Sequence, residues 1–138
     1  MPTMPPMNYV LGFGFTPHQQ VILLLRKKAP FADHWNGLGG KVEDKETFRE
    51  AMVREFHEEC GQTTKPDDWR YFGRMFGPSW TVHLFRHTIA IPEIATTTDE
   101  MVMAWRLDSL PNNVVPNLNW LVPMAYYNDT FVEVKYDS

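Results

Sequence analysis

The chain has 138 residues, of which 43% are hydrophobic and 14% aromatic, and its formal net charge is -4. This length is typical of one compact domain, and the composition supplies enough apolar side chains for a real core. The only basic run is residues 26–28, whereas duplex-binding proteins usually present a clear basic face. We therefore expect a single domain over residues 1–138 that does not bind a nucleic-acid polymer.

Cys60 is the only cysteine, so no intrachain disulfide can form and a reducing compartment is expected. No stretch approaches the roughly 18 consecutive apolar residues of a membrane helix. Residues 1–7 also lack the charged start and apolar core of a signal peptide. These features predict a cytoplasmic protein with no membrane partner.

The first elements are predicted from apolar runs and the turn residues between them. Residues 1–7 contain three prolines and are expected to form a flexible arm. Two strands follow over residues 9–15 and 21–25, separated by the turn-prone segment 16–18, and residues 37–40 form a glycine-rich approach to the next element.

A helix is predicted to begin at a capping box formed by Thr47 and Glu50, and to end at Gly61. In the capping box, the threonine hydroxyl and the glutamate each satisfy a backbone N–H group that has no partner within the helix. Its buried stripe is expected to consist of Phe48, Ala51, Met52 and Phe56.

Further strands are predicted over residues 69–75, 81–91 and 101–107, because each is rich in aromatic or β-branched residues. A second helix is expected over residues 118–127, with Pro123 near its first turn, and residues 131–136 alternate as a final strand would. Strands interrupted by helices that pack on both faces indicate an α/β protein, an α/β/α sandwich with a central mixed β-sheet.

The most informative run is residues 40–62, GKVEDKETFREAMVREFHEECGQ, which fits the spacing G-x5-E-x7-R-E-U-x-E-E-x-G, where U is apolar. Within it, Glu55, Glu58 and Glu59 lie at i, i+3 and i+4, so a helix places all three carboxylates on one face. Like charges stacked in this way destabilise a helix, whereas Mg2+ takes carboxylate oxygens as ligands and removes the repulsion. The pattern therefore indicates a metal site, and the alternative is a solvated acidic helix face.

This run resembles the signature of the Nudix hydrolases, with Gln62 standing where the signature ends in an apolar residue. The resemblance implies the Nudix fold and Mg2+-dependent hydrolysis, with Mn2+ as a possible substitute. It implies a catalytic set and a metal-ligand set that share four glutamates, and it leaves open which of them is the general base. The catalytic set is Arg54, Glu55, Glu58, Glu59 and Glu100, and the metal ligands are the Gly39 carbonyl with Glu55, Glu58, Glu59 and Glu100. Arg54 is also expected to pair with Glu46 and to orient the loop and the helix, and Glu50 lies at a favourable i, i+4 spacing from it.

The segment WNGLGGK at residues 35–41, with Arg26 and Lys27 before it, is similar to the MutT branch of the family, which includes a mammalian homologue that sanitises oxidised purine nucleoside triphosphates. The likeness implies a substrate-binding set of Arg26, Lys27, Asn36, Lys41 and Asn117. An asparagine amide offers both donors and an acceptor to a base edge, although Asn36 could instead only shape a turn beside Gly37. The mammalian relative carries paired aspartates after the proline, whereas this chain has Asn117 and Leu118, so the base preference stays open.

The resulting hypothesis is a nucleoside triphosphate pyrophosphohydrolase that releases a nucleoside monophosphate and pyrophosphate, with 8-oxo-dGTP as the leading substrate. Two alternatives remain, a Nudix hydrolase of ADP-ribose or a dinucleoside polyphosphate, and a non-catalytic nucleotide-binding module. The protein is expected to act as a monomer or a homodimer. The aromatic residues that could stack on a base, or else belong to the core, are Phe72, Phe76, Trp80 and Trp105.

Overall fold

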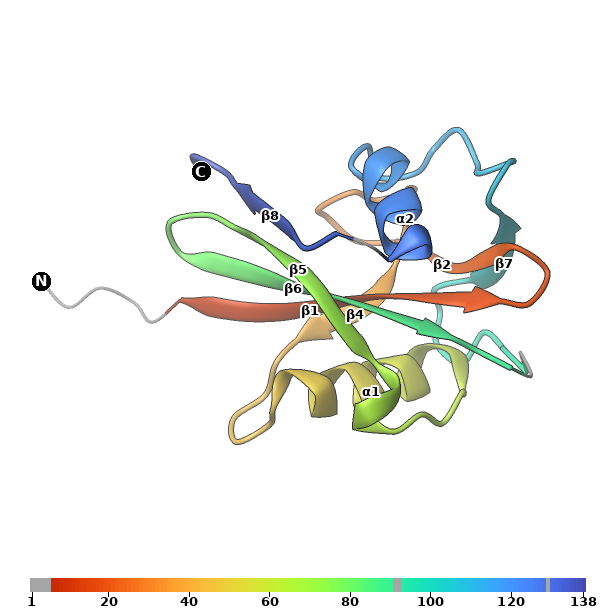
Figure 1. The fold of residues 1–138 in the computed structure, drawn as a ribbon, viewed down its shortest axis with the longest axis horizontal. Helices are drawn as coiled ribbons and strands as arrows, with labels where there is room; N and C mark the ends of the chain where they lie inside the picture. Colours follow the sequence, from red (N-terminus) through yellow and green to blue (C-terminus); the bar gives the residue numbers. More distant parts are fainter. Residues whose placement is uncertain (1–5, 91–92, 129) are drawn as a thin grey trace, which may run out of the picture.

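The structure is a computed structural model that describes residues 6–90, 93–128 and 130–138. In this part of the chain, the predicted strands and helices occur in the predicted order, and two short strands are added before the first helix (Figure 1). The elements are β1 (Met7–Thr16), β2 (Gln20–Leu25), β3 (Trp35–Asn36), β4 (Leu38–Lys41), α1 (Phe48–Cys60), the 3-10 turn η1 (Pro66–Asp68), β5 (Arg70–Phe76), β6 (Trp80–Thr88), β7 (Val102–Arg106), α2 (Leu118–Tyr127) and β8 (Val132–Lys135).

The strands form one mixed sheet, as predicted. The order is β3-β2-β1-β6-β5-β8, with β4 paired to β1 and β7 paired to β2. The pairs β1·β6 and β5·β8 are parallel, and the others are antiparallel. Strand β1 is central, because Leu11 has Leu84 of β6 as its register partner on one side and Gly39 of β4 on the other.

The two helices cover opposite faces of the sheet, α1 on the lower face and α2 on the upper face in Figure 1. Each helix belongs to its own buried cluster: Met52 and Phe56 of α1 pack with Ile22 and Phe85, whereas α2 packs over Phe13 and its neighbours. This arrangement confirms the α/β/α sandwich. Within the described residues, no helix is both long enough and apolar enough to cross a membrane.

Helix α1 begins and ends where the sequence predicts. The Thr47 hydroxyl accepts from the Glu50 amide at 3.1 Å, the Glu50 carboxylate accepts from the Thr47 amide at 2.8 Å, and Gly61 ends the helix with φ of 79°. Three members of the predicted stripe are fully buried, but the prediction was wrong for Phe48, which is 38% exposed. Its ring stacks on His83, with 3.7 Å between the ring centroids, because the first turn reaches only the periphery of the buried cluster.

The glycine-rich segment was not predicted as strand, because β3 and β4 are short and show no alternation. Strand β4 lies so close to β1 that a Cβ atom on Gly39 would overlap the carbonyl oxygen of Val10. The predicted arm is also too long, since Met7 already pairs with Trp80 of β6, while residues 1–5 lie outside the described part. The strand predicted over residues 81–91 ends at Thr88, and residue 91 is not described.

Candidate active site

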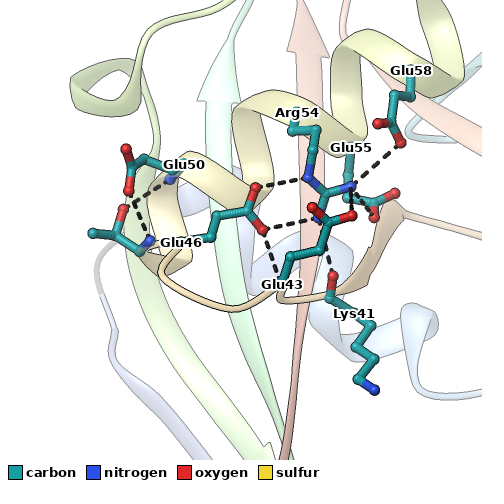
Figure 2. Close-up of polar contacts among 8 residues, drawn as sticks. Lys41, Glu43, Glu46, Glu50, Arg54, Glu55 and Glu58 are labelled. Atoms are coloured by element: carbon teal, nitrogen blue, oxygen red, sulfur yellow. Dashed lines mark hydrogen bonds and ion pairs between the residues drawn. The ribbon is translucent and has the colours of Figure 1, made fainter.

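Arg54 joins the start of the motif to helix α1 (Figure 2). Its Nε and Nη2 atoms donate to the two carboxylate oxygens of Glu46 at 2.7 and 3.0 Å, a two-point contact of the strong kind. Its Nη1 atom donates to Oε1 of Glu55 at 2.8 Å, and Nη2 also donates to the Lys41 carbonyl at 3.1 Å. Arg54 therefore holds the loop, the strand β4 and the helix in one arrangement.

The surrounding carboxylates differ in how firmly Arg54 holds them. The hydrogen bond from Arg54 lowers the pKa of Glu46, and the same bond is the main cause that raises the pKa of Arg54. Glu58 is 55% exposed and lies 3.4 Å from Nη1, so this contact is weaker. Glu50, at the predicted i, i+4 spacing, instead completes the capping box with Thr47. The pairing of Arg54 with Glu46 is thus confirmed.

Glu59 is the most perturbed carboxylate of the site. Burial raises its pKa to about 8, the charges of Glu55 and Glu100 act in the same direction, and a hydrogen bond from the Gly39 amide opposes them. That amide donates to Oε1 of Glu59 at 2.8 Å. The charge of Arg26 has the smallest effect on the pKa of Glu59, so the neighbouring negative charges outweigh it. A cation beside Glu59 would therefore be favourable.

Glu55 lies against strand β4, at the side of the helix that faces the sheet. Its side chain is 14% exposed, and burial raises its pKa even though Arg54 stabilises the ionised form. A Cβ atom on Gly40 would lie 2.5 Å from Oε1 of Glu55. The absence of a side chain at Gly40 therefore leaves the space that the Glu55 carboxylate occupies.

Glu100 reaches the same region from the loop before β7. Its Oε2 atom accepts the backbone amide hydrogen of Lys27 at 2.8 Å. Glu100 thus connects its own loop to residues 26–34, whose backbone is folded further by bonds from Arg26 to His34 and from Asp33 to Arg26. It is near enough to Glu59 for its charge to raise the pKa of that group.

The oxygen ligands present at this site fit Mg2+, which prefers carboxylate oxygens. Glu55, Glu59 and Glu100 each use one carboxylate oxygen in a hydrogen bond to Arg54, Gly39 or Lys27, and the second oxygen of each has no hydrogen-bond donor among the described residues. With the side chains as they stand, no three acidic, histidine or cysteine groups among the described residues converge tightly enough to hold an ion. Metal binding would therefore require these carboxylates to move closer together.

A cavity of about 730 Å3 is lined in part by Gly39 and Gly40, the two glycines of β4 that also adjoin Glu59 and Glu55. It brings together most of the predicted substrate-binding residues, and Lys27 is the exception, because its contact with the site is through its backbone amide. The predicted substrate-binding residues that line the cavity are Arg26, Asn36, Lys41 and Asn117, and Gly39, predicted as a metal ligand, lines it as well. Lining residues that the sequence did not identify include Tyr9, Phe31, Met75 and Tyr136.

Two asparagines give the cavity one donor group and one acceptor. The carbonyl oxygen of Asn36 accepts from the Gly37 amide at 2.8 Å, which leaves its NH2 group for another partner. The side-chain oxygen of Asn117 is buried and has no hydrogen-bond partner among the described residues, while its NH2 group contacts the sulfur of Met75 at 3.4 Å. A buried acceptor without a partner is costly, so Asn117 is suited to a ligand N–H.

Aromatic side chains form part of the cavity wall. Trp80 and Tyr136 lie with their ring centroids 5.5 Å apart, and Phe31 on the loop before β3 is 47% exposed. Of the four aromatics considered from the sequence, only Trp80 lines this cavity. Phe72 is buried in the core, Trp105 packs on Trp35, and the guanidinium of Arg74 lies over the ring of Phe76.

The family model described as the NUDIX domain matches residues 6–123. The chain belongs to the Nudix hydrolase family. A mouse protein named oxidized purine nucleoside triphosphate hydrolase is 34% identical over an alignment of 110 residues, which covers 75% of this chain and 68% of that protein. The signature identified from the sequence is thus confirmed as that of a Nudix hydrolase, a family of enzymes that act on nucleotide-type substrates and typically depend on a divalent metal.

Solved structures confirm the fold. A NUDIX hydrolase from Nitrosomonas europaea has a TM-score of 0.83 at 18% identity and covers 99% of this chain and 82% of its own. A MutT structure reported for Aliivibrio salmonicida and Vibrio cholerae has a TM-score of 0.72 at 24% identity, covering 85% of this chain and 93% of its own. The mixed sheet with a helix on each face is therefore the Nudix fold.

Proposed function

We propose that this Nudix hydrolase is a Mg2+-dependent nucleoside triphosphate pyrophosphohydrolase that produces a nucleoside monophosphate and pyrophosphate. One observation carries the proposal: the two glycines of strand β4 adjoin both the acidic groups and the cavity. The Gly39 amide and the space beside Gly40 hold the carboxylates of Glu59 and Glu55, while the same two glycines line the cavity. A nucleoside in the cavity would thus place its phosphates beside the acidic groups.

The basic and acidic residues of the site have different roles in the proposed reaction. Arg26 and Lys41 line the cavity and supply positive charge to the phosphates. Mg2+ bound by the carboxylates would neutralise phosphate charge and lower the pKa of water. Glu55, Glu59 and Glu100 supply carboxylates both for the metal and for accepting the proton of the attacking water. As the water oxygen bonds to the α-phosphorus, the bond from this phosphorus to the oxygen that bridges the α and β phosphates breaks, and the bridging oxygen leaves with pyrophosphate.

An oxidised purine is the base that the cavity supports best. An 8-oxo purine carries an additional ring N–H beside a carbonyl oxygen, and the cavity presents the unpaired acceptor of Asn117 and the NH2 donors of Asn36. The flat faces of Trp80 and Tyr136 suit a stacked base. The substrate is therefore proposed to be a free nucleotide such as 8-oxo-dGTP, hydrolysed in the cytoplasm.

A nucleotide panel tests this function directly. Pyrophosphate release would be measured with 8-oxo-dGTP and the four canonical deoxynucleoside triphosphates, and nucleotide products would be measured with ADP-ribose and a dinucleoside polyphosphate, each with and without Mg2+ or Mn2+. We expect metal-dependent release of pyrophosphate, with the highest kcat/KM for 8-oxo-dGTP. Hydrolysis of ADP-ribose alone would replace the proposed substrate, and binding of nucleotides without any turnover would indicate a non-catalytic module.

The variant Glu59→Gln tests whether the acidic groups carry the reaction. It should reduce kcat by about 100-fold or more, because the amide keeps the shape and the bond from Gly39 but loses the charge. Glu43→Gln is the matched control, since Glu43 is 66% exposed and lies 3.7 Å from Arg54. Normal turnover in Glu59→Gln, with both variants folded, would contradict the catalytic assignment.

A further inference from the structure

Strand β8 has one edge that no other described strand covers. It occupies one end of the sheet order and pairs with β5 alone, and in Figure 1 it lies at the outer margin of the molecule. The Tyr136 amide donates to the Phe76 carbonyl at 2.8 Å, which fixes the alternation of the ladder. The backbone groups of Val134 therefore face β5, and those of Glu133 and Lys135 point outward.

An edge of this kind is a template for another strand. Glu133 and Lys135 flank Val134, so their side chains share one face of β8, and both are exposed. A second copy of β8 that runs antiparallel to the first presents Lys135 and Glu133 in the reverse order. Each charged residue of one copy can therefore lie opposite a residue of the opposite charge in the other copy. The edge thus carries both the hydrogen-bonding groups and the charge pattern for a second copy of itself.

We propose that β8 pairs with β8 of a second copy of this chain, antiparallel and centred on Val134. In this register Glu133 lies opposite the partner's Lys135, and Lys135 lies opposite the partner's Glu133. Both are hydrogen-bonded pairs, because the backbone groups of these residues point outward, and the two Val134 residues form the non-hydrogen-bonded pair between them. The two sheets then become continuous across the contact.

The charges select this register over its neighbours. Centring the pair on Glu133 would place two glutamates opposite each other, and centring it on Lys135 would place two lysines opposite each other; like charges in these positions are destabilising. The adjacent strand favours the central register further. Arg74 of β5 donates to Oε2 of Glu133 at 2.9 Å, so each Glu133 would lie between Arg74 and the partner's Lys135.

The contact is small, and it adjoins the cavity. A strand of four residues buries less than a standard interface of roughly 1,600 Å2, so association should be weak and depend on concentration. Tyr136, directly after β8, forms part of the cavity wall, so pairing would also steady one side of the cavity. The pairing itself does not depend on which substrate is hydrolysed, and the following tests use no activity measurement.

Charge reversal tests the proposed register. Sedimentation over increasing protein concentration should show the apparent mass rising from 16.1 kDa by up to twofold. Glu133→Lys alone and Lys135→Glu alone should each remain monomeric, because each places like charges opposite one another. An equimolar mixture of the two variants should associate again, since both cross-strand pairs regain opposite charges. A monomer at every concentration, or a mixture that stays monomeric, would overturn the proposal.

A disulfide provides an independent test. The two Cα atoms of a non-hydrogen-bonded antiparallel pair are about 4.5 Å apart, within the range for a disulfide. Val134→Cys should therefore form a covalent dimer under mild oxidation, whereas the control Lys135→Cys should not, because its equivalent residue lies two positions away along the ladder. The native Cys60 is fully buried and should not interfere. Equal crosslinking of both variants would contradict this register.

Discussion

The backbone amide of Gly39 donates to Oε1 of Glu59 at 2.8 Å, and this bond joins strand β4 to the last turn of helix α1. The two residues are 20 positions apart in the sequence, yet they adjoin because β4 pairs with β1 and α1 packs across both strands. The next residue, Gly40, acts differently, because its lack of a side chain leaves room for the Glu55 carboxylate. The two glycines therefore position two of the proposed metal ligands.

Substitution of these glycines by alanine should have different effects. A Cβ atom at Gly39 would meet the backbone of Val10, so Gly39→Ala should lower the melting temperature by several degrees or prevent folding. At Gly40 the three atoms nearest to the new atom all belong to the Glu55 carboxylate. Gly40→Ala should therefore change the melting temperature little while reducing kcat/KM by about tenfold or more. Thermal unfolding and steady-state kinetics distinguish the two, and full activity in Gly40→Ala would argue against the role of Glu55.

Two substitutions at Glu100 separate its charge from its bond to Lys27. Glu100→Gln retains an acceptor for the Lys27 amide but loses the charge, so kcat should fall by about tenfold or more while KM changes little. Glu100→Ala should lower kcat similarly and also raise KM, because the loop carrying Phe31 loses an anchor. An effect of Glu100→Gln on KM alone would place Glu100 at the periphery of the substrate.

The asparagines should determine base selectivity. Asn117→Leu removes the unpaired acceptor with little change in volume, so kcat/KM for the preferred nucleotide should fall by about 10–100-fold, and less for poor substrates. Asn36→Ala should likewise reduce the difference in kcat/KM between the preferred nucleotide and poor substrates. Asn119→Ala is the matched control, because Asn119 is exposed on α2 and does not line the cavity. Equal losses for every nucleotide would show that these residues do not read the base.

Base choice should also depend little on pH. An amide at Asn117 cannot take up a proton near neutrality as a carboxylate can. The ratio of kcat/KM for 8-oxo-dGTP to that for dGTP should therefore stay nearly constant from pH 6 to pH 8, and it should be smaller than in the mammalian relative with its paired aspartates. Measuring this ratio in the wild type and in Asn117→Asp would reveal whether the substitution introduces pH dependence.

His83 should make folding stability depend on pH. Its Nδ1 atom accepts from the Tyr71 hydroxyl, and its Nε2–H group donates to the side-chain oxygen of Asn8, an arrangement that suits the neutral ring. Burial lowers the pKa of His83 to about 4, and the charge of Arg74 acts in the same direction. The unfolded chain, with an ordinary histidine pKa of about 6.5, then binds the proton more readily. Stability should be fully present above pH 6.5 and should fall as the pH drops towards 4, by as much as about 3 kcal/mol.

Urea unfolding at pH 7.5 and pH 4.5 checks this expectation. His83→Gln should be less stable than the wild type at pH 7.5, because it loses the stacking with Phe48. It should nevertheless lose less stability than the wild type on acidification, since no ionisable ring remains at this position. An equal loss in both proteins would assign the acid sensitivity to other groups.

The sequence by itself determined the parts of the site that depend on local geometry. The spacing of Glu55 and Glu59 places them one turn apart in any α-helix, and the capping box at Thr47 and the glycine at Gly61 define that helix from adjacent residues. The second helix was predicted with its observed bounds, and the family signature followed from the same short run. Backbone hydrogen bonding over three or four residues decides these features, so a single stretch of sequence contains them.

Only the tertiary structure decided which groups meet across the sheet. The pair of Arg54 and Glu46 was expected from the signature, but the helical spacing that also favoured Glu50 is not used, because Glu50 caps the helix, and Glu58 is left largely in solvent. The bond from the Lys27 amide to Glu100 joins residues 73 positions apart. Tyr136 likewise lines the cavity beside residues that are distant in the sequence, such as Asn36. These contacts depend on strand order and register, because only the paired sheet fixes which distant side chains share one face.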